Sequence, residues 1–342
     1  MKRKRDEPIG ILKFAPKLAE ADKPDPRAMT SIELRVKSHK LIELNHGWEK
    51  AISYSQYSIY AKCPYQWKLS YVDRLNPYKN NIHTIFGTAI HETIQHYLTV
   101  MYEFSAVHAD TVINLPEYFQ GRLRENILED FKKTGIHFTD PIELNEFYED
   151  GVEILRYFSL NRHKYFRNAG CRLVGIEVPI LTNIKGNIYL RGFIDVIIYD
   201  EVNDKVIIYD LKTSGRGWDK EKKDALKIAQ VLLYKEYFAQ QYSWDVEKIE
   251  VIFLILKRKI YENAQFPIPR IQEFIPPAGK GKRVQAVENL DRFITECFDK
   301  DGKHKDREYV KVVGMDSCKF CPYSDDATLC DKNKKPKQSK KK

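Results

Sequence analysis

The chain has 342 residues, with 57 lysines and arginines against 48 aspartates and glutamates, so its formal net charge is +9. Hydrophobic residues make up 43% and aromatic residues 12%, a globular composition that excludes a disordered or fibrous protein. No apolar run approaches the roughly 20 residues needed to span a bilayer. The basic segment 2–5 has no apolar stretch after it, unlike a secretory signal. We therefore expect neither a membrane protein nor a secreted one.

The excess of basic residues is concentrated at the two ends of the chain. Segment 2–5 is entirely basic, and segment 332–342 contains seven lysines and no acid. We expect residues 1–45 to form a basic arm with little regular structure, and residues 331–342 to form a basic disordered tail. Such ends are either simply solvated or bind phosphates through nonspecific, salt-sensitive attraction. One domain, residues 46–330, is expected between them.

The first part of this domain, residues 52–170, is predicted to be mostly helical. Ser53 or Ser55 is a suitable N-cap for a first helix, and Pro64 stops or kinks it. Apolar residues at helical spacing predict further helices at about 82–102, 116–133 and 142–167.

The hydrophobic period changes to that of strands in the core 171–260. Segments rich in Val, Ile and Tyr predict an antiparallel meander of 172–181, 188–199 and 205–212. A helix over 223–241, a strand over 249–256, a short strand near 269–275 and a helix over 282–299 follow. The order predicts an α/β fold with a mixed central sheet flanked by helices, preceded by a helical N-terminal portion.

The strongest candidate site is formed by Asp210 and Lys212. Residues two apart in a strand point to the same face, so the two side chains project together. The preceding turn centres near residue 202, so antiparallel partners have numbers that add up to about 404 or 405, which places Asp195 opposite Asp210. Two adjacent carboxylates repel unless a proton or cation lies between them, and Mg²⁺ or Mn²⁺ prefers oxygen ligands. The alternative is a pair of solvated acids beside a turn.

Residues around this strand could contact a nucleic acid. Arg216, Trp218 and Lys220 follow it in a flexible loop, where they contact phosphates or form an ordinary solvated loop. Gln230 and Tyr234 are four apart and share one face of the next helix. Tyr57 belongs to an aromatic-rich segment that either stacks the bases of a single strand or packs the helix onto the core.

Three cysteines crowd near the C-terminus. Cys318, Cys321 and Cys330 have the spacing C-x2-C-x8-C, which suits a tetrahedral metal or an iron–sulfur cluster. A closed site needs a fourth ligand, and Cys63, which precedes Pro64, is the best candidate. The other two cysteines, Cys171 and Cys297, are expected to be buried core residues.

These motifs together resemble the RecB-type branch of the PD-(D/E)XK nuclease superfamily. The matching pieces follow the family's order: FGTAIH at 86–91, GFID at 192–195, DLK at 210–212 and QVLLY at 230–234. The resemblance implies a restriction-endonuclease-like core that binds Mg²⁺ or Mn²⁺. Its implied metal ligands are His91, Asp195, Asp210 and the backbone carbonyl of Leu211. The implied catalytic residues are Asp195, Asp210, Lys212, Gln230, Tyr234 and Glu177.

The cysteine pattern resembles the iron–sulfur nucleases of this branch, namely AddB and the CRISPR-associated RecB-like exonucleases. In those proteins a [4Fe–4S] cluster joins the two ends of the nuclease domain. The resemblance implies that Cys63, Cys318, Cys321 and Cys330 hold such a cluster, with zinc as the alternative. The spacing before Cys330 is longer than is usual in the family.

The expected function is a metal-dependent DNA exonuclease that prefers single strands or DNA ends and acts in replication, recombination or repair. A helicase or another replication or recombination protein is a conceivable partner. The alternatives are a structure-specific endonuclease or end processor, and a non-catalytic DNA-binding subunit with a nuclease fold. The expected location is cytoplasmic or nucleoid-associated.

Overall fold

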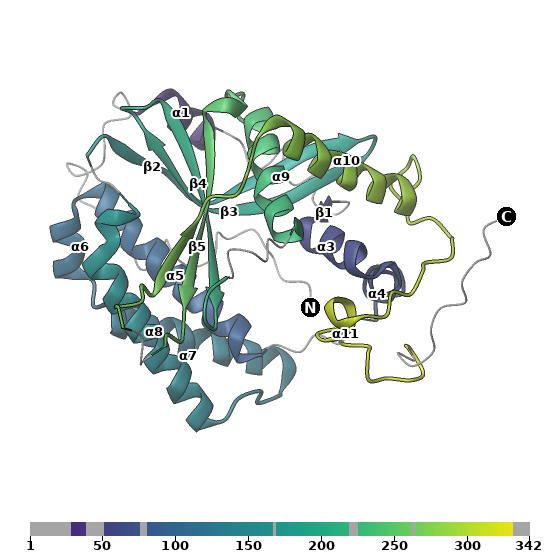
Figure 1. The fold of residues 1–342 in the computed structure, drawn as a ribbon, viewed down its shortest axis with the longest axis horizontal. Coiled ribbons are helices and arrows are strands. Elements are labelled where there is room, and N and C mark those ends of the chain that lie inside the picture. Colours follow the sequence, from purple (N-terminus) through teal and green to yellow (C-terminus); the bar gives the residue numbers. More distant parts are fainter. Residues whose placement is uncertain are drawn as a thin grey trace.

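The computed structural model describes residues 29–38, 51–75, 81–166, 169–218, 225–261 and 265–330. The predictions made for segments 2–5 and 331–342 therefore lie outside the described residues. Within the described part of the chain, helices cover both faces of one six-stranded sheet (Figure 1). The mixed α/β architecture predicted from the sequence is confirmed.

The strands are arranged in the order β1-β3-β4-β5-β6, and β2 also pairs with β3. The bounds are β1 Ala51–Ser53, β2 Cys171–Lys185, β3 Ile188–Asp200, β4 Lys205–Ser214, β5 Ile249–Lys257 and β6 Ile271–Phe274. The β2-β3-β4 meander is antiparallel, as predicted, whereas β4–β5 and β1–β3 are parallel pairs. The sheet is therefore mixed.

The helices before the sheet are α1 Ser31–Ser38, α3 Tyr54–Lys62, α4 Pro64–Trp67, α5 Ile82–Glu103, α6 Ala106–Val112, α7 Leu115–Thr134 and α8 Pro141–Asn161. Three more helices follow strand β4 along the chain: α9 Ala225–Gln241, α10 Lys280–Cys297 and α11 Met315–Cys318. Ser53 is the N-cap of α3, where its side chain accepts a hydrogen bond from the backbone N–H of Gln56. Pro64 separates α3 from α4, as predicted.

Two hydrophobic cores lie on opposite faces of the sheet. Helices α1, α3, α9 and α10 contribute to the first core, and α5, α7 and α8 contribute to the second (Figure 1). Strand β4 serves both cores, because Val206 and Ile208 face the first while Tyr209 and Leu211 face the second. This alternation is the one that the sequence of β4 predicts.

Two short elements differ from the sequence analysis. Residues 1–45 were expected to hold little regular structure, but Ser31–Ser38 forms helix α1, and Ile32 is completely buried in the first core. Strand β1 was not predicted, because the analysis placed only the start of a helix there, but Ala51–Ser53 pairs with β3 in parallel. Both elements are stabilised by contacts with residues more than a hundred positions away, which local periodicity does not report.

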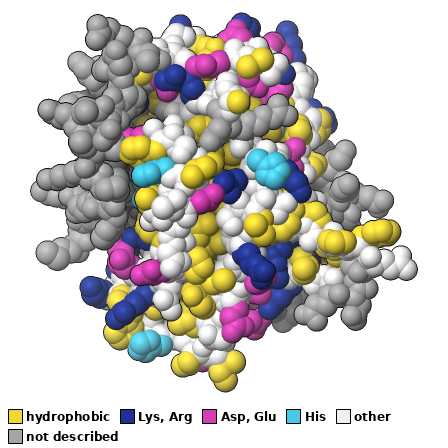
Figure 2. Space-filling model, turned by 90° about the vertical axis from the view of Figure 1, so that its left-hand side faces the viewer, with side chains coloured by type: hydrophobic (Ala, Val, Ile, Leu, Met, Phe, Trp, Pro, Cys, Tyr) yellow, Lys and Arg dark blue, Asp and Glu magenta, His cyan; other side chains and the backbone are white. Residues whose placement is uncertain are grey.

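Charged side chains of both signs occur on the side of the molecule that Figure 2 shows. Figure 2 shows the side of the molecule that is on the left in Figure 1, where acidic and basic side chains are interspersed with hydrophobic ones. In the described part of the chain, no helix combines the length and the hydrophobicity needed to cross a membrane.

Candidate active site

The candidate site lies where strand β3 changes its partner. One edge of β3 pairs with β1 at residues 189–191 and with β4 at residues 196–200. The β3–β4 pairs have numbers that add up to 405, and the next position of this register places Asp195 opposite Asp210, as predicted. Here the backbone N–H of Leu211 donates a hydrogen bond of 2.7 Å to Asp195 Oδ2. The side chain of Asp195 therefore replaces a backbone partner at the point where the two strands part.

Asp210 and Lys212 project together from the end of β4 and form an ion pair. Asp210 Oδ2 lies 2.7 Å from Lys212 Nζ and, within the described residues, has no other hydrogen-bond partner. Burial raises the pKa of Asp210 to about 6, although Lys212 lowers it. Burial opposes the charge of Lys212, but Asp210 and Asp195 outweigh burial and raise the pKa of the ammonium. The single ammonium of Lys212 thus offsets part of the negative charge of the two buried carboxyl groups.

His91 reaches this pair from helix α5. Its Nδ1 lies 3.9 Å from Asp195 Oδ2. Burial, followed by the charge of Lys212, lowers the pKa of His91 to about 4, so the imidazole is neutral at pH 7. A neutral imidazole is the form that binds metal ions. Helix α5 approaches β4 closely because residue 87 is glycine, where a Cβ atom would lie 3.2 Å from Thr213 Oγ1.

Glu177 on strand β2 supplies a third carboxylate. The β2–β3 ladder passes from Ile176–Val196 to Val178–Ile194, so Glu177 faces Asp195 between these pairs. Its backbone has a φ of 48°, in the left-handed region that a non-glycine residue rarely adopts in a strand. Burial, and then the charge of Asp195, raises the pKa of Glu177 to about 7. Backbone strain and a raised pKa at one residue are typical of functional sites.

Gln95 joins Glu177 to Asp195, and the sequence analysis missed it. It lies one helical turn after His91 on α5 and is only 1% exposed. Its Nε2 donates hydrogen bonds to Glu177 Oε1 at 2.6 Å and to the backbone carbonyl of Asp195 at 3.1 Å. The available signal was a polar residue four positions after a candidate ligand, because residues at this spacing share one face of a helix.

Gln230 and Tyr234 face the same site from α9, on the other side of the sheet. Gln230 Nε2 donates to the Tyr234 hydroxyl at 3.3 Å. Burial raises the pKa of Tyr234, and the charges of Asp210, Asp195 and Glu177 raise it further, so the phenol stays protonated. Tyr234 packs directly on Gly192 of β3, where a Cβ atom would lie 2.9 Å from its ring. Glycine is therefore required for this close approach.

The site suits a divalent cation by its chemistry. Three carboxyl groups with raised pKa values meet one ammonium and one neutral imidazole, which leaves an excess of negative charge once they ionise. In this structure the ammonium of Lys212 contacts Asp210. In the described ranges, no group of three or more His, Cys, Asp or Glu side chains is arranged to hold a metal ion. The donor types fit Mg²⁺ or Mn²⁺.

The predicted nucleic-acid contacts occupy different environments. The Arg216 guanidinium lies over the ring of Tyr261 at 5.0 Å, beside the end of β4. Trp218 packs against Phe253 and Phe274, and the ammonium of Lys227 lies over its ring. Lys220 is outside the described residues.

Tyr57 is a core residue of helix α3. Its ring is 5% exposed and packs against Tyr54 and Phe293. The structure therefore favours the interpretation that this tyrosine packs helix α3 onto the core, and we do not propose that it stacks on a base.

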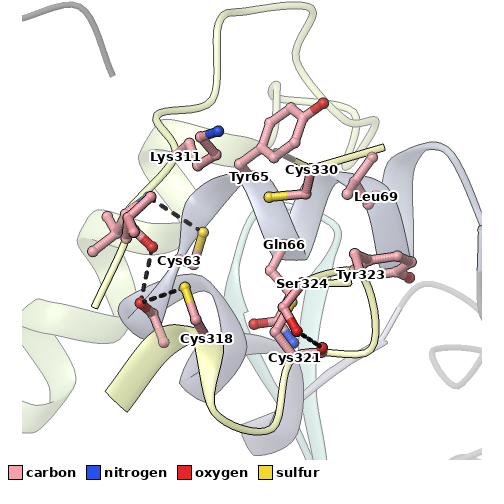
Figure 3. Close-up of a pocket in the computed structure, with 13 residues that line it drawn as sticks. Cys63, Tyr65, Gln66, Leu69, Lys311, Cys318, Cys321, Tyr323, Ser324 and Cys330 are labelled. Carbon is pink, nitrogen blue, oxygen red and sulfur yellow. Dashed lines mark hydrogen bonds between the residues drawn. The ribbon is translucent and has the colours of Figure 1, made fainter. Parts of the chain in front are cut away.

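The structure brings the predicted cysteine ligands together around one pocket (Figure 3). Cys63 lies between α3 and α4, while Cys318, Cys321 and Cys330 come from the C-terminal segment, and all four line the pocket. Burial raises the pKa of Cys321, and the neighbouring Cys330, Cys63 and Cys318 raise it further. Mutual electrostatic influence of this kind requires that the four sulfur atoms are close.

The contacts around the pocket connect the two ends of the domain. The backbone N–H of Val312 donates to Cys63 Sγ at 3.4 Å, and the Tyr65 hydroxyl donates to the carbonyl of Leu329 at 3.1 Å. Backbone donors to sulfur also occur around thiolate-bound metals and iron–sulfur clusters, whose properties they tune. The four thiols fit a tetrahedral site in donor type and number.

One comparison with known proteins identifies a family for the chain. The sequence matches the family model of the PD-(D/E)XK nuclease superfamily over residues 51–326. No curated protein matches the chain. The matched range contains both the carboxylate site and three of the four cysteines, with Cys330 just beyond it. The chain belongs to the PD-(D/E)XK nuclease superfamily.

Proposed function

We propose that this protein is a metal-dependent deoxyribonuclease that hydrolyses phosphodiester bonds. The observation that carries the proposal is the convergence of Asp195, Asp210 and Glu177 on the gap in the edge of β3, with Lys212 as their counter-charge. A scaffold protein has no need of buried carboxyl groups with raised pKa values, because each one destabilises the fold at neutral pH.

His91, Asp195, Asp210 and the carbonyl of Leu211 would hold Mg²⁺ or Mn²⁺. The ion, when bound, supplies positive charge at the phosphate and lowers the pKa of water. Side chains near these ligands supply the other groups that the reaction needs. Lys212 places its ammonium at the carboxylates, where it stabilises negative charge that develops on a phosphate oxygen. Glu177, with a pKa of about 7, is able to accept a proton. Gln230 and Tyr234 offer polar groups to the substrate from α9.

Within this class we favour an exonuclease that acts on single strands or DNA ends in replication, recombination or repair. Support comes from the order of the four motifs, which is that of RecB-type nucleases. A structure-specific endonuclease is the first rival, and a non-catalytic subunit is the second. The proposal that a helicase is a partner rests only on the resemblance of the sequence motifs to those of RecB-type nucleases.

End-labelled single-stranded DNA with Mn²⁺ tests the activity, with Asp210→Asn as the inactive comparison. We expect the wild type to shorten the DNA and the variant to leave it intact, while single-stranded circles stay uncut. Cut circles would replace the exonuclease with the endonuclease. Intact linear DNA with both proteins would contradict the proposed activity, and DNA binding by both would then favour the non-catalytic subunit.

We further propose that Cys63, Cys318, Cys321 and Cys330 hold a [4Fe–4S] cluster, with zinc as the alternative. The pocket that all four line, formed by segments more than 240 residues apart in sequence, supports this proposal. A metal bridge between these segments closes a long loop and restricts the unfolded chain.

Elemental analysis of anaerobically purified protein distinguishes the two metals. Cys321→Ser is expected to lose the metal and to become poorly soluble, whereas the matched variant Cys171→Ser keeps both metal and solubility. A soluble, active Cys321→Ser with unchanged metal content would refute the assignment, and zinc without iron or sulfide would replace the cluster by zinc.

A further inference from the structure

Lys257 is the last residue of strand β5, and it shares a face of the sheet with the candidate active site. Strands β4 and β5 pair in parallel, so that Lys212 lies beside Ile255 and Ser214 lies beside Lys257. Since residues two apart share a face, Lys257 and Lys212 project from the same side. A rise of two residues and a step of one strand place their Cα atoms roughly 8 Å apart.

The ammonium of Lys257 has no counter-charge within the described residues. The side chain is buried, with only 8% of the residue exposed. Burial lowers its pKa, and no carboxylate is near enough to oppose that effect. The ammonium is not among the side-chain polar atoms of the described residues that are sealed from solvent without a partner, although most of the side chain is covered. An uncompensated ammonium in such a place destabilises the fold.

A well-fixed loop covers the stem of Lys257. Gly217 has a φ of 96°, and a Cβ atom there would lie 2.8 Å from Lys257 Cδ. Ser214 Oγ accepts a hydrogen bond from the Gly217 N–H at 3.2 Å and donates to its carbonyl at 3.1 Å. The amide of Gln272 pairs with both the N–H and the carbonyl of Trp218, at 2.8 and 2.9 Å. The loop therefore holds the lysine in one direction instead of leaving it to move with solvent.

We infer that Lys257 forms a phosphate subsite, which binds a backbone phosphate of the DNA strand one or two nucleotides away from the bond that is cut. The inference rests on the proposed function for the nature of the anion. Its support is the covered side chain, the ammonium that is not sealed from solvent, the lack of a nearby carboxylate among the described residues, and the common face with Lys212. Arg216, next to Gly217 on the covering loop, supplies a second cation on that loop, where its guanidinium lies over the ring of Tyr261.

Lys235 on α9 provides a matched control. It is 5% exposed, and burial, followed by the charge of Arg283, lowers its pKa. Three carboxylates oppose that effect at Lys235, namely those of Glu247, Glu250 and Glu236. Lys235 thus has a structural counter-charge and no need of a ligand.

The test compares Lys257→Met with Lys235→Met. Binding of a fluorescent single-stranded oligonucleotide is measured with Mn²⁺ in the Asp210→Asn background, so that the probe stays intact. Lys257→Met is expected to weaken binding about 10-fold for every base sequence, and to reduce the slope of log K against log salt by about 0.7. Lys235→Met is expected to change neither value.

Thermal unfolding gives a second readout. Lys257→Met is expected to raise the melting temperature, because it removes an ammonium that partial burial disfavours and that no described carboxylate compensates, whereas a purely structural lysine would lower it when replaced. Unchanged affinity and salt slope in Lys257→Met would overturn the subsite, and so would failure of the Asp210→Asn chain to bind DNA. Absence of cleavage by the chain with Asp210 intact, with binding still weakened by Lys257→Met, would overturn the nuclease proposal and leave the subsite standing.

Discussion

Replacement of Gln95 by leucine tests whether this residue positions the candidate metal ligands. Leucine has nearly the same volume as glutamine but lacks the amide, so the change removes two hydrogen bonds without opening a large cavity. Those bonds join Gln95 Nε2 to Glu177 Oε1 at 2.6 Å and to the carbonyl of Asp195 at 3.1 Å. Both acceptors belong to the part of the sheet where the strands separate.

The magnitude follows from the two bonds. A hydrogen bond to a charged group contributes about 1.5–3 kcal/mol, and an unsatisfied buried carbonyl costs about 1–3 kcal/mol. Glu177 also loses a bond that holds its carboxylate against a strained backbone. Residues that orient metal ligands typically change metal affinity by about 10–100-fold when they are replaced. We expect Gln95→Leu to weaken Mn²⁺ binding within that range and to lower the melting temperature.

Two assays separate positioning from general destabilisation. Mn²⁺ binding is measured by electron paramagnetic resonance, and cleavage is measured across a series of Mn²⁺ concentrations. Excess Mn²⁺ is expected to restore most of the rate. Thr93→Val is the matched control, because this buried threonine of α5 also loses one hydrogen bond but contacts none of the acids. Wild-type Mn²⁺ affinity in Gln95→Leu would show that Glu177 and Asp195 need no support from α5.

Two further predictions concern the same site. Gly192→Ala places a Cβ atom 2.9 Å from the ring of Tyr234, so we expect it to lower both the melting temperature and the cleavage rate; Gly121→Ala, which meets nothing within 4 Å, is expected to lower neither. Glu177 has its pKa raised from 4.5 to about 7, so its favourable contribution to stability is present below pH 4.5 and is lost as the pH rises through 7. At 1.36 kcal/mol per pH unit the loss is at most about 3 kcal/mol. In EDTA, the wild type is therefore expected to lose more stability between pH 5 and pH 8 than Glu177→Gln does, and equal losses in urea unfolding would contradict this assignment.

The sequence was sufficient for features that depend on spacing along the chain. The register of β3 and β4 follows from the position of the turn between them, and the predicted sum of 405 is confirmed for the pairs that end at Val196 and Tyr209, one step before Asp195 and Asp210. The apolar period correctly predicted helix α5, which brings His91 to these acids. The crowding of the C-terminal cysteines similarly led to the pocket that Cys63 completes.

Features that depend on contacts between distant segments were not available from the sequence. Strand β1 has three residues, too few to show a period, and exists because Ala51–Ser53 pairs with β3. The positive φ of Glu177 leaves no trace in residue types, since a non-glycine residue there is locally unfavourable. The importance of Gln95 and Lys257 arises from what each contacts, or fails to contact, after folding.

The gap in the edge of β3 explains why these side chains meet where they do. Residues 192–195 lie between the part of β3 that pairs with β1 and the part that pairs with β4, so their backbone groups need other partners on this edge. At this edge the carboxylate of Asp195 binds the N–H of Leu211, while the amide of Gln95 binds the backbone carbonyl of Asp195 next to Glu177. Side chains that complete a broken ladder are held in one orientation by the sheet itself. The interruption of the ladder thus positions the acids, and Gly192 at its far end admits Tyr234 from α9.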